Sequence, residues 1–281
     1  MDNRQQIHEW NGAQGEAWVR WHDETEQVVA AFGAAALAAA DPRPGERVLD
    51  VGCGCGTTTF ELARRAGPDG HVLGIDVSRP MLEEARRRAD AARLPQIAFM
   101  EGDAARALFP TDRDLSYSRF GTMFFDDPVA AFRHLRAALR PGGRVVWLAW
   151  RTPRDNPWAT MGVAAARAAL GVAAPPVDPN APGPFALADE DRARTLMIDA
   201  GYVDVHFERR DRTVPIGASP ADAAQRMLHL GPTARFAREQ DPARIPEILS
   251  AVEAALTPLA DATGAVHAPA SAWIIHARNP A

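Results

Sequence analysis

The chain has 281 residues, of which 47% are hydrophobic and 24% charged, and this is the composition of a globular protein. The net charge is -5, from 31 basic and 36 acidic residues without a basic block, so nucleic acid is not expected as a partner. All basic residues are arginine, and the lack of lysine excludes Schiff-base chemistry, a pyridoxal-phosphate anchor, a Walker-type phosphate loop and a protein-kinase site.

Membrane insertion, secretion and metal binding are not predicted either. Charged residues interrupt every apolar stretch well before 18 residues, and the N-terminus has no apolar segment like that of a signal peptide. The two cysteines, Cys53 and Cys55, are too close together for an unstrained disulfide and too few for a structural zinc site. We therefore expect reduced thiols, no metal and a cytoplasmic protein.

The first 150 residues predict an N-terminal helical segment followed by alternating strands and helices. Aromatic and aliphatic residues recur at near-helical spacing over residues 1–40. The expected strands cover residues 47–51, 71–75, 97–101, 114–118 and 145–150. The expected helices cover residues 57–66, a segment with Ser78 as N-cap and Pro80 in its first turn, and residues 128–139. This alternation predicts a parallel sheet.

The alternation lapses after Trp150 and resumes near Ala188, which suggests insertions into one elaborated domain. A helix at 188–200, a strand at 203–210 and a final strand at 271–277 continue the core pattern. The single domain 1–281 then divides into a core and a cap. We assign the core to about 41–150, 188–218 and 263–281, and the cap to about 1–40, 151–187 and 219–262.

A glycine-rich loop stands where the first core strand turns into a helix. It reads Asp50-Val51-Gly52-Cys53-Gly54-Cys55-Gly56, and glycines allow the backbone to turn sharply and approach a ligand with its amides. A dinucleotide fold usually shows the spacing G-x-G-x-x-G, whereas these glycines follow G-x-G-x-G directly after an aspartate. The spacing favours a ligand other than NAD.

Acids follow the next two strands at the same predicted sheet edge. Asp76 lies 20 residues after Gly56, where a carboxylate can accept both hydroxyls of a ribose, and Asp103 follows the third strand. Ligands of open α/β sheets bind outside these carboxyl ends. The loop and the two acids therefore predict one binding crevice.

With these motifs the sequence resembles the class I S-adenosylmethionine-dependent methyltransferases, mainly over residues 45–150. The resemblance implies a Rossmann-like, seven-stranded, mostly parallel sheet with helices on both faces and a helical cap. The turn at 139–143 and the Trp10-Asn11-Gly12 segment are similar to the small-molecule branch that includes ubiquinone and menaquinone methyltransferases. A small-molecule acceptor and S-adenosyl-L-methionine as cofactor follow from this resemblance.

The resemblance also assigns cofactor contacts. The loop glycines would hold the methionine and ribose, Asp76 the ribose hydroxyls, and Asp103 with the Ala104 backbone the adenine. The full set of expected cofactor residues is Asp50, Gly52, Gly54, Gly56, Asp76, Val77, Met81, Asp103, Ala104, Arg119 and Trp18. Arg119 could meet a carboxylate, although a surface salt bridge is an equal alternative.

The acceptor pocket and the chemistry are less determined by the sequence. Residues that could line the pocket are Trp10, Phe124, Trp158, Met161, Met227 and His229, although such aromatic residues more often belong to the core. His22, His134 and His229 are possible bases, but no catalytic residue is assigned. The expected reaction is in-line methyl transfer with the acceptor atom open. Two alternative functions stay open: a nicotinamide-dependent oxidoreductase and a non-catalytic cofactor-binding protein. The oligomeric state, monomer or homodimer, is also open.

Overall fold

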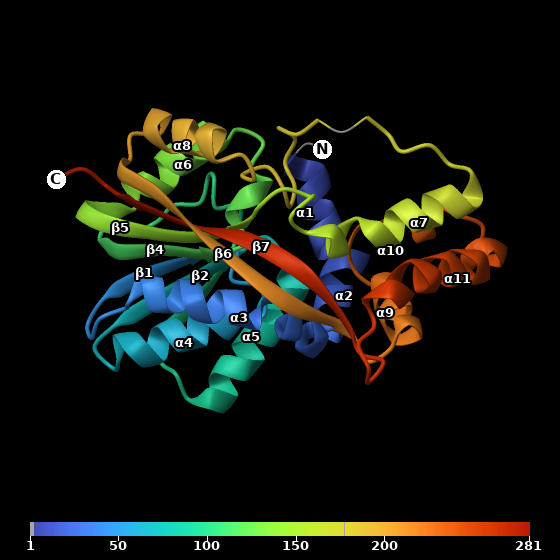
Figure 1. Cartoon of the computed structure of the whole chain (residues 1–281). Helices are drawn as coiled ribbons and strands as arrows, with labels where there is room; N and C mark the ends of the chain where they lie inside the picture. The colour runs from blue at the N-terminus through green and yellow to red at the C-terminus, as the bar shows by residue number, and fades with distance from the viewer. Residues whose placement is uncertain (1–2, 177) are drawn as a thin grey trace.

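Seven strands form one sheet in a computed structural model that describes residues 3–176 and 178–281 (Figure 1). The strands are β1 (Arg47–Val51), β2 (His71–Asp76), β3 (Ile97–Glu101), β4 (Arg113–Arg119), β5 (Leu139–Trp150), β6 (Val203–Gly217) and β7 (Val266–Arg278). Their order is β3-β2-β1-β4-β5-β7-β6. Strands β1 to β5 pair in parallel, and β7 is antiparallel to both neighbours. The predicted seven-stranded, mostly parallel sheet is confirmed.

Helices cover both faces of this sheet and build a cap at one end (Figure 1). The helices are α1 (Asn3–Asn11), α2 (Ala13–Arg20), α3 (His22–Ala40), α4 (Thr57–Ala66), α5 (Arg79–Ala92), α6 (Pro128–Ala137), α7 (Met161–Leu170), α8 (Glu190–Asp199), α9 (Pro220–Met227), α10 (Gly231–Arg238) and α11 (Ile245–Leu256). Short 3₁₀ turns are η1 (Thr122–Phe124), η2 (Pro157–Ala159), η3 (Pro242–Arg244) and η4 (Thr257–Leu259). Helices α3, α4 and α5 lie on the face opposite α6 and α8, while α7, α9, α10 and α11 gather beside α1 and α2.

The N-terminal helical segment differs from the prediction in that it is broken twice. Gly12 lies in a turn with non-helical backbone angles between α1 and α2, and Trp21 precedes α3 in a non-helical conformation. The alanine-rich half of α3 buries Phe32, Ala36 and Ala40 against the sheet. This half is therefore part of the core and not of a detachable cap.

Notable differences from the predicted boundaries concern α6 and the strands β5, β6 and β7. Helix α6 ends at Ala137 instead of residue 139, because β5 already begins at Leu139 and bulges at residues 140–143 before its regular pairing resumes. Strands β6 and β7 pair far beyond residues 210 and 271. The extra part of β6 begins with exposed polar residues at 211–213, so apolar alternation returns only at the buried Val214 and Ile216.

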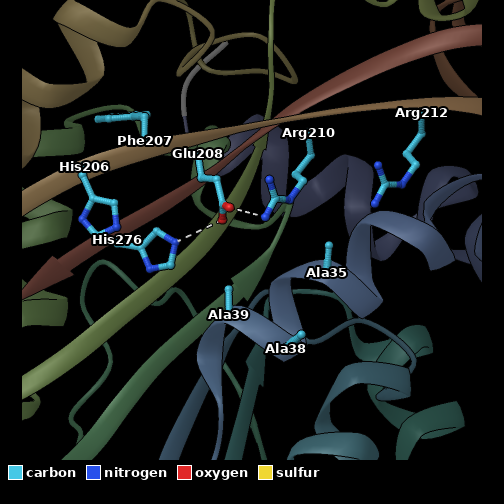
Figure 2. Close-up of a pocket in the computed structure, with 9 residues that line it drawn as sticks. All are labelled: Ala35, Ala38, Ala39, His206, Phe207, Glu208, Arg210, Arg212 and His276. Atoms are coloured by element: carbon cyan, nitrogen blue, oxygen red, sulfur yellow. Dashed lines mark hydrogen bonds and ion pairs between the residues drawn. The ribbon is translucent and has the colours of Figure 1, made fainter.

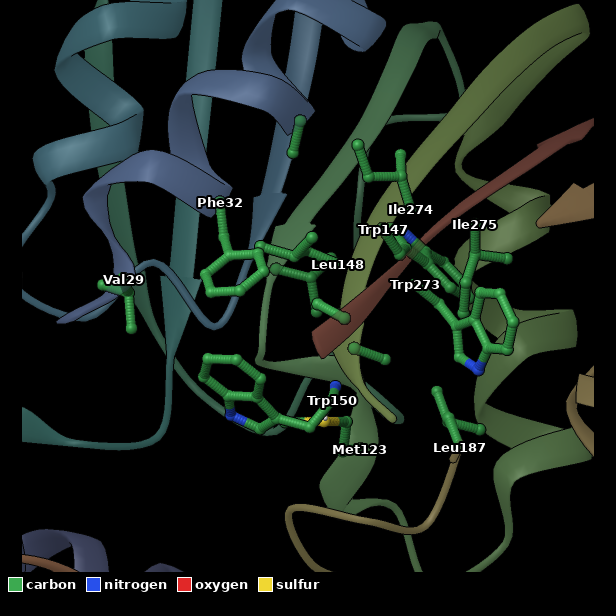
Figure 3. Packing of buried hydrophobic residues seen from close by; sticks show 14 of the residues in the cluster. Val29, Phe32, Met123, Trp147, Leu148, Trp150, Leu187, Trp273, Ile274 and Ile275 are labelled. Atoms are coloured by element: carbon green, nitrogen blue, oxygen red, sulfur yellow. Dashed lines mark hydrogen bonds between the residues drawn. The ribbon is translucent and has the colours of Figure 1, made fainter. Parts of the chain in front are cut away.

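The core lies on both faces of β5, as Figure 3 shows. Trp147 is fully buried, packs against Phe132 of α6 at a centroid distance of 4.9 Å, and donates from Nε1 to Ser116 Oγ at 3.1 Å. Trp150 meets Phe32 of α3 at 5.3 Å. Large side chains thus hold β5 between α3 and α6. This packing fixes the position of the edge at which β4 and β5 end.

The helices of the fold can be compared with the length that a membrane span requires. None of the helices in the described ranges combines the length and the apolar character needed to cross a bilayer.

Candidate functional site

A cavity of about 380 Å³ opens where β1, β2, β3 and β4 end, beneath the cap. Its wall at the sheet edge consists of the glycine loop and the segments after the next strands, with Gly52, Cys53, Gly54, Cys55, Thr57, Thr58, Ile75, Asp76, Val77, Gly102, Asp103, Ala104, Arg119, Phe120 and Gly121. The loop and the two acids that the sequence predicted to share a crevice therefore lie in one cavity.

Hydrogen bonds tie the glycine loop to Asp76. The Gly54 amide donates to Asp76 Oδ2 at 2.9 Å, and the Ser78 amide donates to Oδ1 at 2.8 Å. Burial raises the pKa of Asp76, and these amide hydrogen bonds oppose the increase. Ser78 is at the N-cap position of α5, but its hydroxyl donates to Trp10 O at 2.7 Å instead of capping the helix.

The backbone of the loop requires glycine for two reasons. Gly52 and Gly54 have φ values of +70° and +54°, where side chains are disfavoured. A Cβ atom on Gly52 would lie 2.7 Å from Gly121 Cα, and one on Gly54 would lie 2.8 Å from Met81 Cε. Backbone amides can therefore line the cavity closely.

Asp50 and Gly56 support the loop from below and do not line the cavity in the described structure. Asp50 is fully buried, and its Oδ2 accepts hydrogen bonds from Thr59 Oγ1 at 2.7 Å and Thr58 Oγ1 at 3.1 Å. Its Oδ1 is buried without a partner among the described residues. Burial raises the pKa of Asp50 to about 6. Gly56, at φ +84°, begins α4 beside Phe60.

Asp103 lines the part of the cavity where β3 ends. Its Oδ1 accepts from the Ala105 amide at 2.9 Å, and its Oδ2 lies 3.7 Å from Arg106 Nε. Ala104, Val77 and Met81 line the cavity nearby, as does Gly102. An acid between apolar walls can accept from an amine while the walls hold a flat ring.

Arg119 forms a partly buried ion pair and not the surface salt bridge that was its alternative. Its two terminal nitrogens bind the two oxygens of Glu26, with NH1 to Oε2 at 2.8 Å, and the side chains are 14% and 21% exposed. Burial alone would raise the pKa of Glu26, but the Arg119 hydrogen bond and charge outweigh burial and lower it. Glu26 was not predicted, because it approaches Arg119 only when α3 folds over the sheet.

His22 belongs to a second polar group on the cavity wall. His22 Nε2 lies 2.7 Å from Arg88 NH1 and 3.2 Å from Thr57 Oγ1, and Arg88 NH1 also donates to Cys55 O at 3.1 Å. Because an arginine can only donate, Nε2 carries a lone pair and the ring proton is on Nδ1. Burial and the neighbouring Arg88 lower the pKa of His22. The ring is thus neutral at pH 7 and its Nε2 is already engaged.

Most of the predicted aromatic residues face the cavity, and two predicted residues do not. Trp18 and the expected acceptor residues Trp10, Phe124, Trp158 and Met227 line the cavity. Trp10 meets Trp18 at 5.8 Å and Phe124 edge-on at 5.9 Å between ring centroids. Met161 packs against the core, and His229 stacks on Trp21 at 4.7 Å, both outside the cavity lining.

Several cavity residues were missed because they come from distant segments. Phe120 and Trp150 stack with centroids 3.9 Å apart, and both line the cavity together with Gln6, Ile7, Phe185, Ile216 and Arg226. Phe120 follows directly after the predicted Arg119, so its place at the sheet edge was a usable signal. The remaining contacts depend on how the cap folds back.

A second, more open groove of about 680 Å³ lies at the other end of α3, between Ala35, Ala38 and Ala39 and strands β6 and β7 (Figure 2). His206 and His276 stack there at 4.3 Å, and Glu208 binds Arg210 and lies 3.8 Å from His276 Nε2. The groove contains none of the residues that the sequence singled out. Its acid is already paired with its own basic residues.

Comparison with known proteins relates the sheet-edge part of the chain to methyltransferases. Residues 48–143 match the family model of a methyltransferase domain. The chain is 40% identical over 107 residues to the nocamycin O-methyltransferase of Saccharothrix syringae, which covers 37% of this chain and 38% of that protein. It is 37% identical over 118 residues to a ubiquinone/menaquinone biosynthesis C-methyltransferase of Ruegeria sp., covering 41% and 47%. Residues 48–143 are therefore similar to the domain shared by methyltransferases.

These methyltransferase matches have a defined extent. The chain spans less than half the length of the two curated relatives, and the domain match ends at residue 143, before the insertions of the cap. A phosphoethanolamine N-methyltransferase of Haemonchus contortus, solved with S-adenosylhomocysteine, has a TM-score of 0.54 at 18% identity and covers 89% of this chain and 52% of its own. At this identity the likeness concerns the fold alone. The predicted similarity to the ubiquinone and menaquinone branch is confirmed.

Proposed function

We propose that this chain is a methyltransferase that transfers the methyl group of S-adenosylmethionine to a small, largely apolar organic acceptor. One observation carries the proposal: a single cavity has the glycine loop and two acids at one end and aromatic and aliphatic side chains of the cap at the other. The residues at the first end fit the cofactor, because carboxylates can accept from a ribose and an amine while glycine backbone allows close approach.

The proposed cofactor contacts follow the sheet edge. Asp76 accepts the ribose hydroxyls, since each of its oxygens keeps acceptor capacity beside its amide partner. Asp103 and the Ala104 backbone meet the adenine, with Val77 and Met81 as apolar walls. Gly52 and Gly54 face the methionine portion. When bound, S-adenosylmethionine supplies a methyl group activated by a positively charged sulfur.

The chain itself would act mainly by alignment and by exclusion of water. Trp10, Trp18 and Phe124 wall the cavity, and aromatic faces attract a cation such as a sulfonium. His22 does not serve as the general base in this proposal, because its Nε2 already accepts from Arg88. An acceptor atom that is nucleophilic or acidic enough needs no stronger base.

The acceptor is proposed to be chosen by the cap, which contributes Trp158, Phe185 and Met227 to the cavity. The relatives named above are an O-methyltransferase and a C-methyltransferase, so oxygen and carbon are both reasonable acceptor atoms. The two thiols, Cys53 and Cys55, are buried and free, and burial raises the pKa of Cys55 to about 12. Unreactive, reduced thiols suit the cytoplasm, which we propose as the site of action.

Calorimetry with S-adenosylhomocysteine, NAD and NADP tests the cofactor assignment. We expect S-adenosylhomocysteine to bind and the two nicotinamide cofactors not to bind. Transfer of a labelled methyl group to a panel of phenols, enols and carboxylic acids then tests catalysis. Binding of NAD in place of S-adenosylhomocysteine would refute the proposal, and cofactor binding without turnover on any acceptor would favour a non-catalytic role.

A further inference from the structure

The roof of the cavity holds an arginine whose terminal nitrogens are unused. Arg226, in the last turn of α9, lines the cavity and is 26% exposed. Its Nε lies 2.9 Å from Asp222 Oδ2 without hydrogen-bond geometry, and no other acceptor in the described ranges binds its guanidinium. The other arginine of the lining, Arg119, has both terminal nitrogens bound by Glu26. Arg226 is therefore the arginine of this lining that can receive a ligand.

The start of α10 lies directly beside Arg226. The amides of His229 and Leu230 bond back to Arg226 O at 3.0 and 3.2 Å, so a tight turn connects this arginine to Gly231. Residues 230–233 all line the cavity. Helix α10 therefore presents its N-terminus to the same space as the guanidinium.

This N-terminus has unused donors. No acceptor in the described ranges binds the amides of Gly231 or Thr233, and Leu230 provides no side-chain cap. Thr233 is a residue of the cavity lining and only 3% exposed, and no hydrogen bond binds its hydroxyl in the described ranges. Amides at a helix start carry a partial positive charge and favour an anion.

We infer that the methyl acceptor carries a carboxylate, and that this carboxylate binds between Arg226 and the first turn of α10. The inference deepens the proposed function and rests on it. A single negative charge fits best, because Asp222 already offsets part of the Arg226 charge and a phosphate monoester would bring nearly two charges. Apolar neighbours such as Trp158, Met227 and Leu230 would hold the body of the molecule. The carboxylate is then an anchor in the cap and not the atom that is methylated.

The test uses the full chain saturated with S-adenosylhomocysteine and three pairs of probes. Phenylacetate, 3-phenylpropanoate and 2-naphthoate are each compared with the corresponding carboxamide by titration calorimetry. At least one acid should bind roughly ten- to a hundred-fold more tightly than its amide. Arg226→Gln should abolish this preference and leave the affinity for S-adenosylhomocysteine unchanged, and Thr233→Val should reduce the preference partly.

Arg238→Gln is the matched control. Arg238 is an exposed arginine of α10, the helix whose first turn forms the proposed site, and it lies outside the cavity lining. The inference is overturned if no acid is preferred, if the preference survives Arg226→Gln, or if turnover converts the carboxylate into its methyl ester. Failure of S-adenosylhomocysteine to bind, with the acid preference intact, would instead refute the proposed function and leave the anion site standing.

Discussion

The Gly54 amide donates a hydrogen bond to Asp76 Oδ2 at 2.9 Å, and this bond joins the loop after β1 to the acid that follows β2. The same carboxylate accepts from the Ser78 amide at the start of α5. Asp76 thus fixes two turns of the cavity wall and retains lone pairs for a ligand. Loss of its carboxylate affects both the shape of the loop and the contact with the cofactor.

Asp76→Ala should weaken binding of S-adenosylhomocysteine by about 1–3 kcal/mol, because charge-assisted acceptors are lost at a buried site. Calorimetry measures the loss, and far-UV circular dichroism verifies the fold. Asp69→Ala, at an exposed aspartate far from the cavity lining, should bind normally. Unchanged affinity in folded Asp76→Ala would refute the ribose assignment.

Gly54→Val should abolish cofactor binding while the far-UV spectrum stays native-like. A β-branched residue at φ +54° is strained, and its Cβ would already lie 2.8 Å from Met81 Cε on the cavity wall. Gly45→Val is the matched control, since Gly45 has φ +82° with nothing within 4 Å of an added Cβ. The control should lose stability through the same kind of strain and keep its affinity for S-adenosylhomocysteine. Normal binding by Gly54→Val would mean that the loop does not cradle the cofactor.

Removal of one partner of the Arg119–Glu26 ion pair should destabilise the fold more than removal of both partners. Arg119→Gln leaves the partly buried Glu26 charge without its partner, and the free energy of unfolding should fall by about 2–4 kcal/mol. The double change with Glu26→Gln should restore much of this loss. Urea unfolding of the single and double variants measures the coupling. Purely additive losses would show that the two side chains act independently.

Burial of Asp50 predicts a pH dependence of stability. Its pKa is 3.8 in the unfolded chain and about 6 in the fold, so the folded state binds more protons between these values. The contribution of Asp50 to the free energy of unfolding is therefore greatest below pH 3.8 and falls as the pH rises toward 6. The predicted total change is about 3 kcal/mol.

Asp50→Asn should remove this pH dependence, because an amide does not ionise in this range. Near pH 4 the variant and the parent should have similar stabilities, and at pH 7.5 the variant should be more stable by up to about 3 kcal/mol. Urea unfolding at several pH values, without cofactor, measures the difference between the two proteins. A difference that stays constant with pH would show that Asp50 titrates normally.

The sheet-edge half of the site could be predicted because each of its parts is local in sequence. A strand, a turn and the next helix follow one another at Asp50 to Gly56, and parallel strands necessarily bring Asp76 and Asp103 to the same edge. The cap half could not be predicted in this way. Glu26 meets Arg119 across 93 residues of sequence, and Arg226 reaches the cavity only through the packing of the cap helices.

Two of the expected pocket residues lie outside the cavity lining, and the reason is physical. Aromatic and sulfur-containing residues satisfy burial equally well in a cavity wall and in the core. Met161 and His229 were expected in the pocket. Met161 packs against the core, and His229 stacks on Trp21. Periodicity identifies a buried face of a helix, but it does not tell a cavity from a core.

The final prediction concerns the docking of α1 and α2 onto the turn that carries Asp76. Asn11 Nδ2 donates to Val77 O at 2.8 Å, and its Oδ1 accepts from the Arg79 amide at 2.9 Å. Trp10 O accepts from Ser78 Oγ, and Arg235 of α10 binds Glu9 at 3.0 Å. The N-terminal helices therefore bridge the proposed ribose site and the cap.

Asn11→Ala should loosen this bridge without unfolding the sheet, because the side chain holds two backbone groups of the β2–α5 turn that no other residue satisfies in the described ranges. We expect faster amide exchange in residues 5–20, affinity for S-adenosylhomocysteine weakened by about 1–2 kcal/mol, and an unchanged far-UV spectrum. Glu16→Ala, at an exposed position of α2 without an ion pair in the described ranges, should change neither exchange nor affinity.

Deletion of residues 1–20 should go further and remove methyl transfer, since α3 would keep His22 and Glu26 in place while the cavity opens to water. If the deletion retains full turnover, the N-terminal helices do not close the site, and if it unfolds the protein, they belong to the core.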